Sequence, residues 1–186
     1  MVQKVILLKN YLNSMSIPLK EEQISLLLSF MDLVLEKNKT VNLTSITSQD
    51  DFIQKHLVDS LTALKYISDN STVLDLGVGG GFPLIPLACI KSSCFFTGVD
   101  SIGKKINFLQ DASKYLNLLN TKFMLMRLGK EEIYLYVIKI DNGKKYKLYK
   151  QTKGYFKSIY ARCTNDTSLS IAMQKLSKIS NIKKEK

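Results

Sequence analysis

A strand that runs directly into glycines is encoded by Val73-Leu74-Asp75-Leu76-Gly77-Val78-Gly79-Gly80-Gly81-Phe82-Pro83, within a chain of 186 residues. The first four residues are largely apolar and follow a turn-forming cluster over residues 68–72, so they predict a short buried strand. The glycines let the backbone turn sharply and approach a ligand without a Cβ in the way. Residues 82–90 then predict a helix, because Pro83 and Pro86 lie in its first turn, where N–H groups have no intrahelical partner. The free N–H groups at such a helix start can meet a polar or anionic ligand.

The spacing of these glycines argues against two common phosphate-binding motifs. A dinucleotide fingerprint, G-x-G-x-x-G, needs a last glycine where this chain has Phe82 or Leu84, depending on the register. A P-loop needs Gly-Lys-Ser or Gly-Lys-Thr after the glycines, and neither follows. The pattern that fits is Asp-x-Gly-x-Gly-x-Gly, which resembles the first motif of class I methyltransferases. Its members are Asp75, Gly77, Gly79 and Gly81. The alternative is an ordinary glycine-rich turn.

A second acid follows at the distance that nucleotide-binding folds use. Residues 95–99 form another short apolar run, which predicts a strand ending at Asp100. An acid about 20 residues beyond a glycine loop reaches ribose hydroxyls in such folds; the alternative is a surface aspartate. A helical apolar stripe comes next, formed by Ile106, Leu109, Ala112, Leu116 and Leu119. Strand, helix, strand and helix in alternation predict a parallel sheet within an α/β fold.

Residues beyond this stripe predict the rest of the sheet. We expect a third strand over residues 121–126 and a fourth strand of the same sheet over residues 155–161. The residues between them are rich in lysine and tyrosine. They predict an inserted hairpin near residues 133–153, turning at Asp141-Asn142-Gly143.

Residues before the glycine loop predict helices. Apolar positions over residues 19–37 fall on one helical face, and those over residues 52–64 predict a second helix that begins at Ser48 or Asp50 as its cap. We therefore expect an N-terminal helical extension over residues 1–68 and a Rossmann-like core over residues 69–186.

Composition and charge bear on partner and compartment. The formal net charge of +11 favours a polyanionic partner such as nucleic acid, although a lysine-rich AT-biased genome explains it equally well. The three cysteines form no C-x-x-C pair, which suits a reducing compartment. No run of 18 apolar residues occurs, so we expect no membrane association.

Separate motifs, in one order along the chain, resemble a single family. They are Asn42-Leu43-Thr44, His56-Leu57-Val58-Asp59-Ser60-Leu61, Gly81-Phe82-Pro83-Leu84-Ile85-Pro86-Leu87 and Asp100-Ser101-Ile102-Gly103-Lys104-Lys105. Over about residues 20–130 the chain resembles the ribosomal RNA small-subunit methyltransferase G family, also called glucose-inhibited division protein B. The resemblance implies a Rossmann-like class I methyltransferase fold that uses S-adenosylmethionine to methylate guanine N7 of 16S ribosomal RNA in the cytoplasm. The implied partner is that RNA or the small ribosomal subunit, and we expect a monomer without a metal.

The resemblance also assigns cofactor contacts by position. They are Gly77 and Phe82 in the glycine loop, Leu128 and Gly129 after the third strand, and Arg162. The motif itself adds Gly79 and Asp100. Family members usually show Arg-Ala-Glu-Glu after the third strand, where this chain has Arg-Leu-Gly-Lys-Glu-Glu over residues 127–132. A backbone contact would survive a slipped register there more readily than a carboxylate contact.

The end of the chain departs from the family pattern. Family members continue through a Pro-Gly-Gly turn and a final pair of antiparallel strands, for which this sequence shows no counterpart. We therefore expect a truncated or divergent copy whose sheet is incomplete at the C-terminus, with weaker activity than a full-length relative. The alternative function is a non-catalytic remnant that binds only cofactor or RNA.

Guanine N7 carries an in-plane lone pair, so its methylation needs no catalytic base and no acid–base residue is nominated. The protein would contribute alignment, which supplies about 7–11 kcal/mol in well-oriented reactions. His56 and Asp59 share a helix face and are candidate substrate contacts, while the preferred alternative is that they organise the joint between extension and core. Lys104 and Lys105 are candidate contacts to RNA phosphates, with a solvated lysine pair as the alternative.

Overall fold

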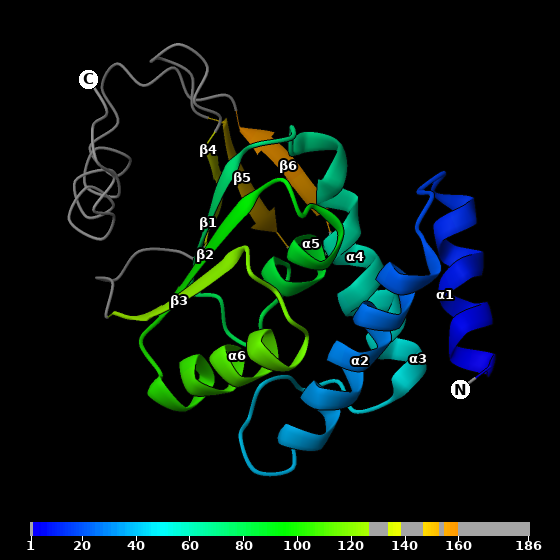
Figure 1. Cartoon of the computed structure of the whole chain (residues 1–186), viewed down its shortest axis with the longest axis horizontal. Coiled ribbons are helices and arrows are strands. Elements are labelled where there is room, and N and C mark those ends of the chain that lie inside the picture. Colours follow the sequence, from blue (N-terminus) through cyan, green and yellow to red (C-terminus); the bar gives the residue numbers. More distant parts are fainter. Residues whose placement is uncertain (1, 127–133, 139–146, 153–154, 160–186) are drawn as a thin grey trace.

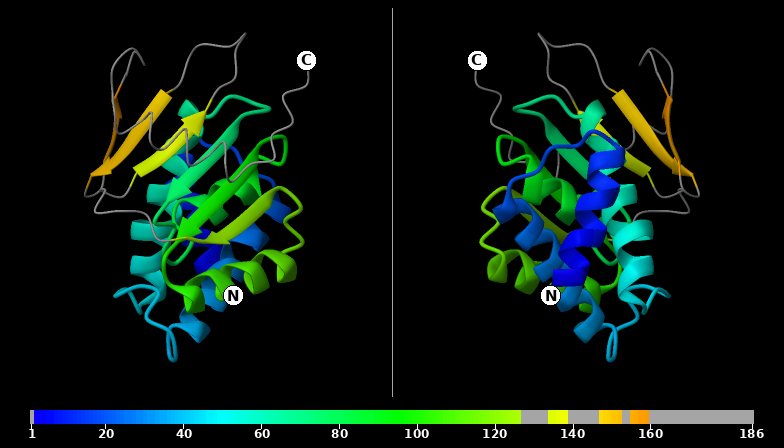
Figure 2. Two further views of the ribbon diagram at one scale, coloured as in Figure 1. Left: turned by 90° about the vertical axis from the view of Figure 1, so that its left-hand side faces the viewer. Right: turned by 90° about the vertical axis from the view of Figure 1, so that its right-hand side faces the viewer.

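The computed structural model describes residues 2–126 together with residues 134–138, 147–152 and 155–159. These residues form a mixed sheet with the strand order β3-β2-β1-β4-β5-β6, and the described helices lie on one of its faces (Figures 1 and 2). The fold is α/β and Rossmann-like, as the alternation of strands and helices predicts. No described helix combines the length and the apolar character that a bilayer crossing requires.

The half of the sheet nearest the glycine loop is parallel. Its strands are β1 (Thr72–Leu76), β2 (Phe95–Asp100) and β3 (Thr121–Leu125), connected by α5 (Leu84–Ile90) and α6 (Gly103–Tyr115). The pairs β1-β2 and β2-β3 are both parallel, which confirms the prediction for these three strands. Because parallel strands end at the same edge, the glycine loop after β1 and Asp100 at the end of β2 come together.

Helix α6 is shorter than its predicted stripe. It ends at Tyr115, and Asn117 adopts a positive φ of 54°, a conformation that commonly terminates helices. Leu116 is still buried, whereas Leu119 is 88% exposed. The prediction that Leu119 belongs to the helical stripe is therefore wrong.

The other half of the sheet is antiparallel. Its strands are β4 (Tyr134–Ile138), β5 (Lys147–Thr152) and β6 (Tyr155–Ile159). Strand β4 pairs with both β1 and β5, so the predicted hairpin range supplies the strand beside β1, while its predicted turn lies outside the described residues. The strand predicted over residues 155–161 is found as β6 in the same sheet, but it pairs antiparallel with β5 and so does not continue the parallel half. Only two residues separate β5 from β6, whereas parallel neighbours need a crossover of about a dozen or more.

Two helices open the chain. The first is α1 (Val2–Ser14) and the second is α2 (Glu21–Lys37), whose bounds confirm the helix predicted there. At the start of α2 the Gln23 side chain accepts a hydrogen bond of 2.9 Å from the Lys20 N–H, and two glutamates lie in the first turn. Helix α1 was not predicted, since its apolar residues surround the helix and only Leu8 and Leu12 are buried.

A continuous helical run follows over residues 49–66. It consists of α3 (Gln49–Phe52), the π-helical segment η1 (Ile53–Val58), α4 (Asp59–Leu61) and the 3-10 segment η2 (Thr62–Tyr66). The Ser48 hydroxyl accepts a hydrogen bond of 3.2 Å from the Asp51 N–H, so Ser48 is the cap of the two that were predicted. The π segment has a wider turn than an α-helix, a feature that is frequent at functional sites, and it carries His56.

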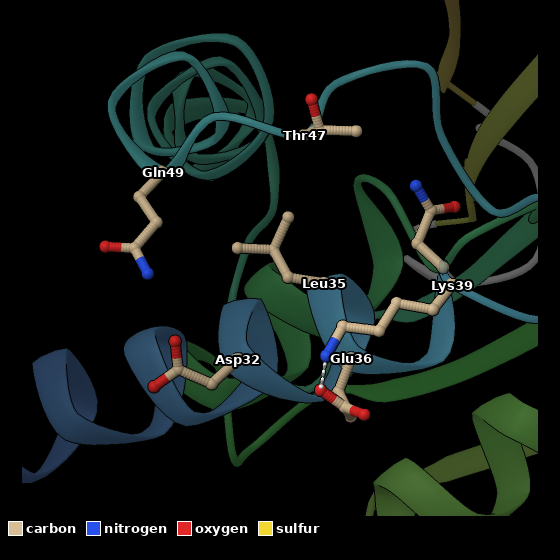
Figure 3. A pocket seen from close by; sticks show the side chains of 7 residues that line it. Asp32, Leu35, Glu36, Lys39, Thr47 and Gln49 are labelled. Atoms are coloured by element: carbon tan, nitrogen blue, oxygen red, sulfur yellow. Dashed lines mark hydrogen bonds and ion pairs between the residues drawn. The ribbon is translucent and has the colours of Figure 1, made fainter.

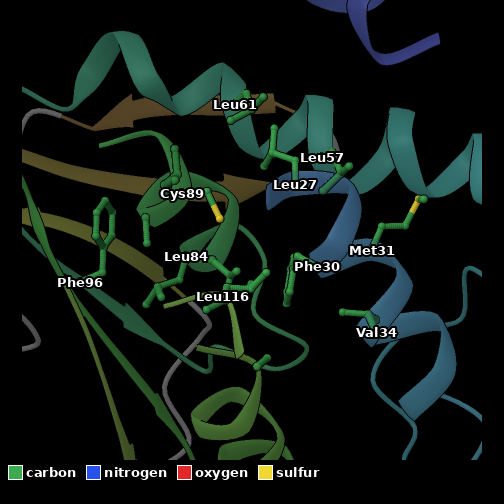
Figure 4. Packing of buried hydrophobic residues seen from close by; sticks show 14 of the residues in the cluster. Leu27, Phe30, Met31, Val34, Leu57, Leu61, Leu84, Cys89, Phe96 and Leu116 are labelled. Carbon is green, nitrogen blue, oxygen red and sulfur yellow. The ribbon is translucent and has the colours of Figure 1, made fainter. Parts of the chain in front are cut away.

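An apolar cluster of the described residues joins these helices to the sheet (Figure 4). Phe30 of α2, Phe52 of α3 and Phe96 of β2 are among its fully buried side chains. Alternate residues of the strands face this cluster, and on the opposite face Leu74 and Val99 are buried as well. The glycine loop is thus held between the sheet and the N-terminal helices.

Candidate functional site

The glycine loop leaves β1 in a fixed turn. The N–H groups of Gly77 and Val78 both donate to the carbonyl of Val99, at 2.7 and 3.0 Å, and the Gly81 N–H donates to the Val78 carbonyl at 2.9 Å. These bonds tie the loop to the end of β2. Gly79 has a φ of +56° and Gly81 one of +96°, which side chains with a Cβ rarely adopt.

The glycines differ in what a side chain would meet. A Cβ on Gly81 would lie 2.7 Å from a methyl group of Leu109 and 3.0 Å from the Phe30 ring, so this glycine allows close packing of the core. A Cβ on Gly80 would lie 2.9 Å from the Leu43 carbonyl oxygen. On Gly79 a Cβ would meet only the Gly77 carbonyl oxygen, at 3.7 Å. Gly79 therefore faces open space, the arrangement expected of a ligand cradle.

Asp100 closes one side of this space. Its Oδ2 accepts a hydrogen bond of 2.9 Å from the Gly79 N–H, and its Oδ1 accepts one of 2.9 Å from the Ile102 N–H. The side chain is largely buried. Gly77, Gly79 and Asp100, all predicted as cofactor contacts, are thus brought together, and Asp100 also orients the loop.

Asp75 is a member of the motif that the sequence did not single out as a contact. Its Oδ2 is buried and has no hydrogen-bond partner. Burial, and then the charge of Asp100, raise the pKa of the Asp75 carboxyl well above its usual range. The two acids interact because Asp75, Gly98 and Asp100 lie on the same face of β1 and β2 in the parallel register. Its place in the Asp-x-Gly motif is the signal that could have identified it.

Phe82 lies among rings from several elements. The His56 ring stacks on it, with centroids 4.1 Å apart and planes 10° from parallel, and Phe30 and Phe52 each approach it to 5.3 Å. His56 Nε2 is 2.7 Å from the Thr44 hydroxyl. Burial lowers the pKa of His56 to about 4, so the ring is neutral at pH 7. Phe82 and His56, predicted for different roles, are therefore in direct contact.

The remaining predicted residues have separate positions. Asp59 begins α4 and is partly buried, and its carbonyl accepts a bond of 2.6 Å from the Thr62 hydroxyl. Lys104 is exposed and Lys105 partly buried, both in the first turn of α6 directly after Asp100. Predicted contacts at Leu128, Gly129 and Arg162 lie outside the described residues.

Two exposed apolar side chains at the same edge were missed by sequence reasoning. Ile102 follows β2 and is 47% exposed, and Leu125 ends β3 and is 61% exposed. A Cβ on Gly103 would lie 3.8 Å from a methyl group of Leu125, which places Leu125 close to the residue that follows Ile102. They offer an apolar surface beside Asp100.

A separate hollow of about 520 Å³ opens between α2 and the start of α3 (Figure 3). Its lining residues are Asp32, Leu35, Glu36, Asn38, Lys39, Thr47 and Gln49. None of them is a predicted site residue, and the glutamate among them pairs with the lysine. Among the described residues, no group of three or more histidine, cysteine, aspartate and glutamate side chains could hold a metal ion.

A parallel β3-β2-β1 order, a glycine loop after β1 and an acid at the end of β2 are features of Rossmann-like folds, the class of fold to which class I methyltransferases belong. Residues 23–146 match the family model for rRNA small subunit methyltransferase G, and the chain belongs to this family.

Individual relatives agree with this membership. The Ribosomal RNA small subunit methyltransferase G of Francisella philomiragia is 42% identical over 121 residues, which cover 65% of this chain and 59% of the relative. That of Alkaliphilus metalliredigens is 32% identical over 138 residues, covering 72% and 58%. The chain thus spans less than two thirds of the length of these curated relatives. A solved structure of coclaurine N-methyltransferase bound to N-methylheliamine and SAH aligns with a TM-score of 0.40 and 18% identity, over 77% of this chain and 46% of that one.

Proposed function

We propose that this chain binds S-adenosylmethionine at the carboxyl edge of β1 and β2 and transfers its methyl group to guanine N7 of 16S ribosomal RNA. The observation that carries the proposal is the open space at Gly79, bordered by Asp100, in a member of this family. The unpaired Oδ2 of Asp75 is buried next to this edge, where Asp75 interacts with Asp100. The RNA substrate, the ribosomal partner and residence in the cytoplasm come from the family alone.

The described residues fit the chemistry of the cofactor. A buried carboxyl oxygen without a partner is unfavourable, and an ammonium group such as that of the methionine moiety would satisfy it at Asp75. Asp100 offers a carboxylate to ribose hydroxyls, on condition that its bond to the Gly79 N–H is shared or exchanged. Ile102 and Leu125 offer an apolar surface to the adenine ring.

Residues of the chain would act by holding and aligning. The cofactor supplies an electrophilic methyl group on a sulfonium, and guanine N7 supplies a lone pair, so no proton has to leave before transfer. A neutral His56 with its pKa near 4 is a poor general base at pH 7, which agrees with a mechanism that has no acid–base residue. Lys104 and Lys105 would meet RNA phosphates, which lie next to the cofactor edge in this proposal.

Two measurements on the 186-residue chain test the proposal. Isothermal titration calorimetry with S-adenosylhomocysteine should show saturable binding with one site per chain. Radiolabelled methyl transfer to unmethylated small ribosomal subunits, followed by strand scission specific for N7-methylguanine, should place the label in 16S RNA. Absence of binding would refute the cofactor site. Binding without transfer would favour the alternative of a non-catalytic protein that holds cofactor or RNA.

A further inference from the structure

The segment with residues 43–46 contacts the glycine loop directly. The Leu43 carbonyl oxygen approaches Gly80 so closely that a Cβ there would lie 2.9 Å away. The conformation of this segment is fixed by Asn38, whose Oδ1 accepts from the N–H groups of Leu43 and Thr44 at 2.8 and 3.1 Å, and whose Nδ2 donates to the Thr44 carbonyl at 2.9 Å. The segment therefore lies against the cofactor loop in one defined arrangement.

Thr44 extends this arrangement to His56. The Thr44 hydroxyl accepts a hydrogen bond of 3.1 Å from the Ile46 N–H, and it lies 2.7 Å from His56 Nε2, where either group can donate. His56 in turn stacks on Phe82, the last residue of the glycine loop before Pro83. The imidazole of His56 thus connects the segment to the loop, because its edge contacts Thr44 and its face stacks on Phe82.

The chemistry of the ring suits a connector. The ring is partly buried and lies edge-on to Phe52 with centroids 4.9 Å apart, so it is held on a further side. A charged imidazolium would lose part of its hydration in these surroundings, whereas a neutral ring can stack and accept or donate one bond. Phenylalanine at position 56 would keep the stack on Phe82 and lose the hydrogen bond to Thr44, so the contributions of the two contacts can be separated.

We propose that His56 is a positioning residue that couples the segment 43–46 to the glycine loop. The segment, His56 and the loop then form one unit, which fixes the position of the cofactor relative to the groups on the N-terminal side of the site. This inference rests on the proposed function, because it assigns the role of the unit in methyl transfer. His56 does not touch the reacting atoms in this scheme. It acts through Phe82 and Thr44.

Variants of the full chain separate the bond from the stack. Thr44→Val and His56→Phe each remove the hydrogen bond, and each should lower kcat for methyl transfer roughly tenfold while the affinity for S-adenosylhomocysteine changes less than about threefold. The double variant should be no slower than Thr44→Val, which also removes the bond from the Ile46 N–H, because both changes break the Thr44–His56 contact. His56→Ala also removes the stack and should weaken S-adenosylhomocysteine binding about tenfold. Thr47→Val, the same change at the exposed threonine that directly follows this segment, is the matched control.

A readout without turnover comes from the fact that His56 is the only histidine in the chain. Its ring signals in the NMR spectrum should shift when S-adenosylhomocysteine is added, equally in the wild type and in Thr47→Val. Three results would each overturn the coupling. The first is His56 ring signals that do not shift when S-adenosylhomocysteine binds, and the second is an unchanged kcat in folded Thr44→Val. The third is a loss of kcat in the double variant that equals the product of the two single losses. A wild-type chain that binds no S-adenosylhomocysteine would instead refute the proposed function and, with it, this role.

Discussion

Gly79→Ala is the sharpest test of the cofactor cradle, because it adds one methyl group to space that the described residues leave open. The new Cβ would meet only the Gly77 carbonyl oxygen, at 3.7 Å, so the folded protein can accommodate it. The backbone φ of +56° imposes a strain of about 1–2 kcal/mol on a residue with a Cβ. For a protein of this size, that corresponds to a fall in Tm of roughly 2–8 °C.

The expected loss of ligand binding exceeds this structural effect. A methyl group in the cradle occupies volume that the cofactor needs, so S-adenosylhomocysteine should bind at least about tenfold more weakly, which is 1.4 kcal/mol or more. Gly79→Val, with a β-branched side chain, should abolish measurable binding. Gly81→Ala is the comparison, because its Cβ would lie 2.7 Å from Leu109 and 3.0 Å from Phe30. Overpacking and backbone strain together should destabilise that variant by roughly 2–5 kcal/mol.

Calorimetry at a temperature where every variant is folded measures affinity, and thermal denaturation measures stability. The expected pattern is a folded Gly79→Ala that binds poorly and a Gly81→Ala whose main defect is stability. Wild-type affinity in folded Gly79→Val would refute the cradle. A large loss of stability in Gly79→Ala would show that the space is not open.

Three further predictions concern Asp75, His56 and the core. Asp75→Asn should weaken S-adenosylhomocysteine binding at least about tenfold in calorimetry but change the free energy of unfolding by less than about 1 kcal/mol. The reason is that the amide has nearly the shape of the carboxyl, whose pKa burial and the charge of Asp100 raise, but cannot carry its negative charge. Equal affinity would refute a role for that charge. The folded pKa of His56, about 4, lies below the unfolded value of 6.5, so the unfolded chain binds the extra proton and stability is lost as pH falls through this window. His56→Phe cannot titrate and is the reference. Between pH 7 and pH 4 the free energy of unfolding of the wild type, measured by chemical denaturation, should fall by roughly 1–3 kcal/mol more than that of the variant, a range discounted for the partial exposure of the ring. Parallel pH profiles of the two proteins would contradict the lowered pKa. Phe96→Ala should lower the free energy of unfolding by about 3–5 kcal/mol in the same assay, because Phe96 is fully buried. Phe95→Ala, at the exposed end of the same strand, should lower it by less than about 1 kcal/mol. Equal effects of the two substitutions would contradict the assigned core.

Local patterns in the sequence were sufficient for the parallel half of the fold. Apolar periodicity predicted β1 and β2 to within one residue and a helix over residues 19–37, which is found over residues 21–37. Capping chemistry predicted Ser48 or Asp50 as the next cap, and Ser48 is the one observed. The meeting of Gly79 with Asp100 follows as well, since parallel strands bring their carboxyl ends to one edge.

Features that depend on distant contacts were not predictable in the same way. Helix α1 lacks a clear apolar face, and Leu8 and Leu12 become buried only against other elements. The antiparallel pairing of β4 with β1 depends on which strand lies beside β1. Strand-forming residues predict that a strand forms but do not specify its neighbour. The stack of His56 on Phe82 joins residues 26 positions apart, and a π-helical segment, which apolar periodicity does not predict, presents the ring.

The positions that violate ordinary packing rules in the described part of the chain gather at one edge of the sheet. Buried side-chain oxygens normally have partners, and glycines in a core normally allow close contact. Asp75 Oδ2 has no partner, and Gly79 opens onto space instead of packing against a neighbour, while Gly80 and Gly81 beside it are closely surrounded. Sequences usually break such rules where function requires it. Because both exceptions border the carboxylate of Asp100, whose charge contributes to the raised pKa of Asp75, a ligand with a cationic group and hydroxyls would relieve them together. S-adenosylmethionine carries both kinds of group, which is why this edge, and not the hollow beside α2, is the site we assign to it.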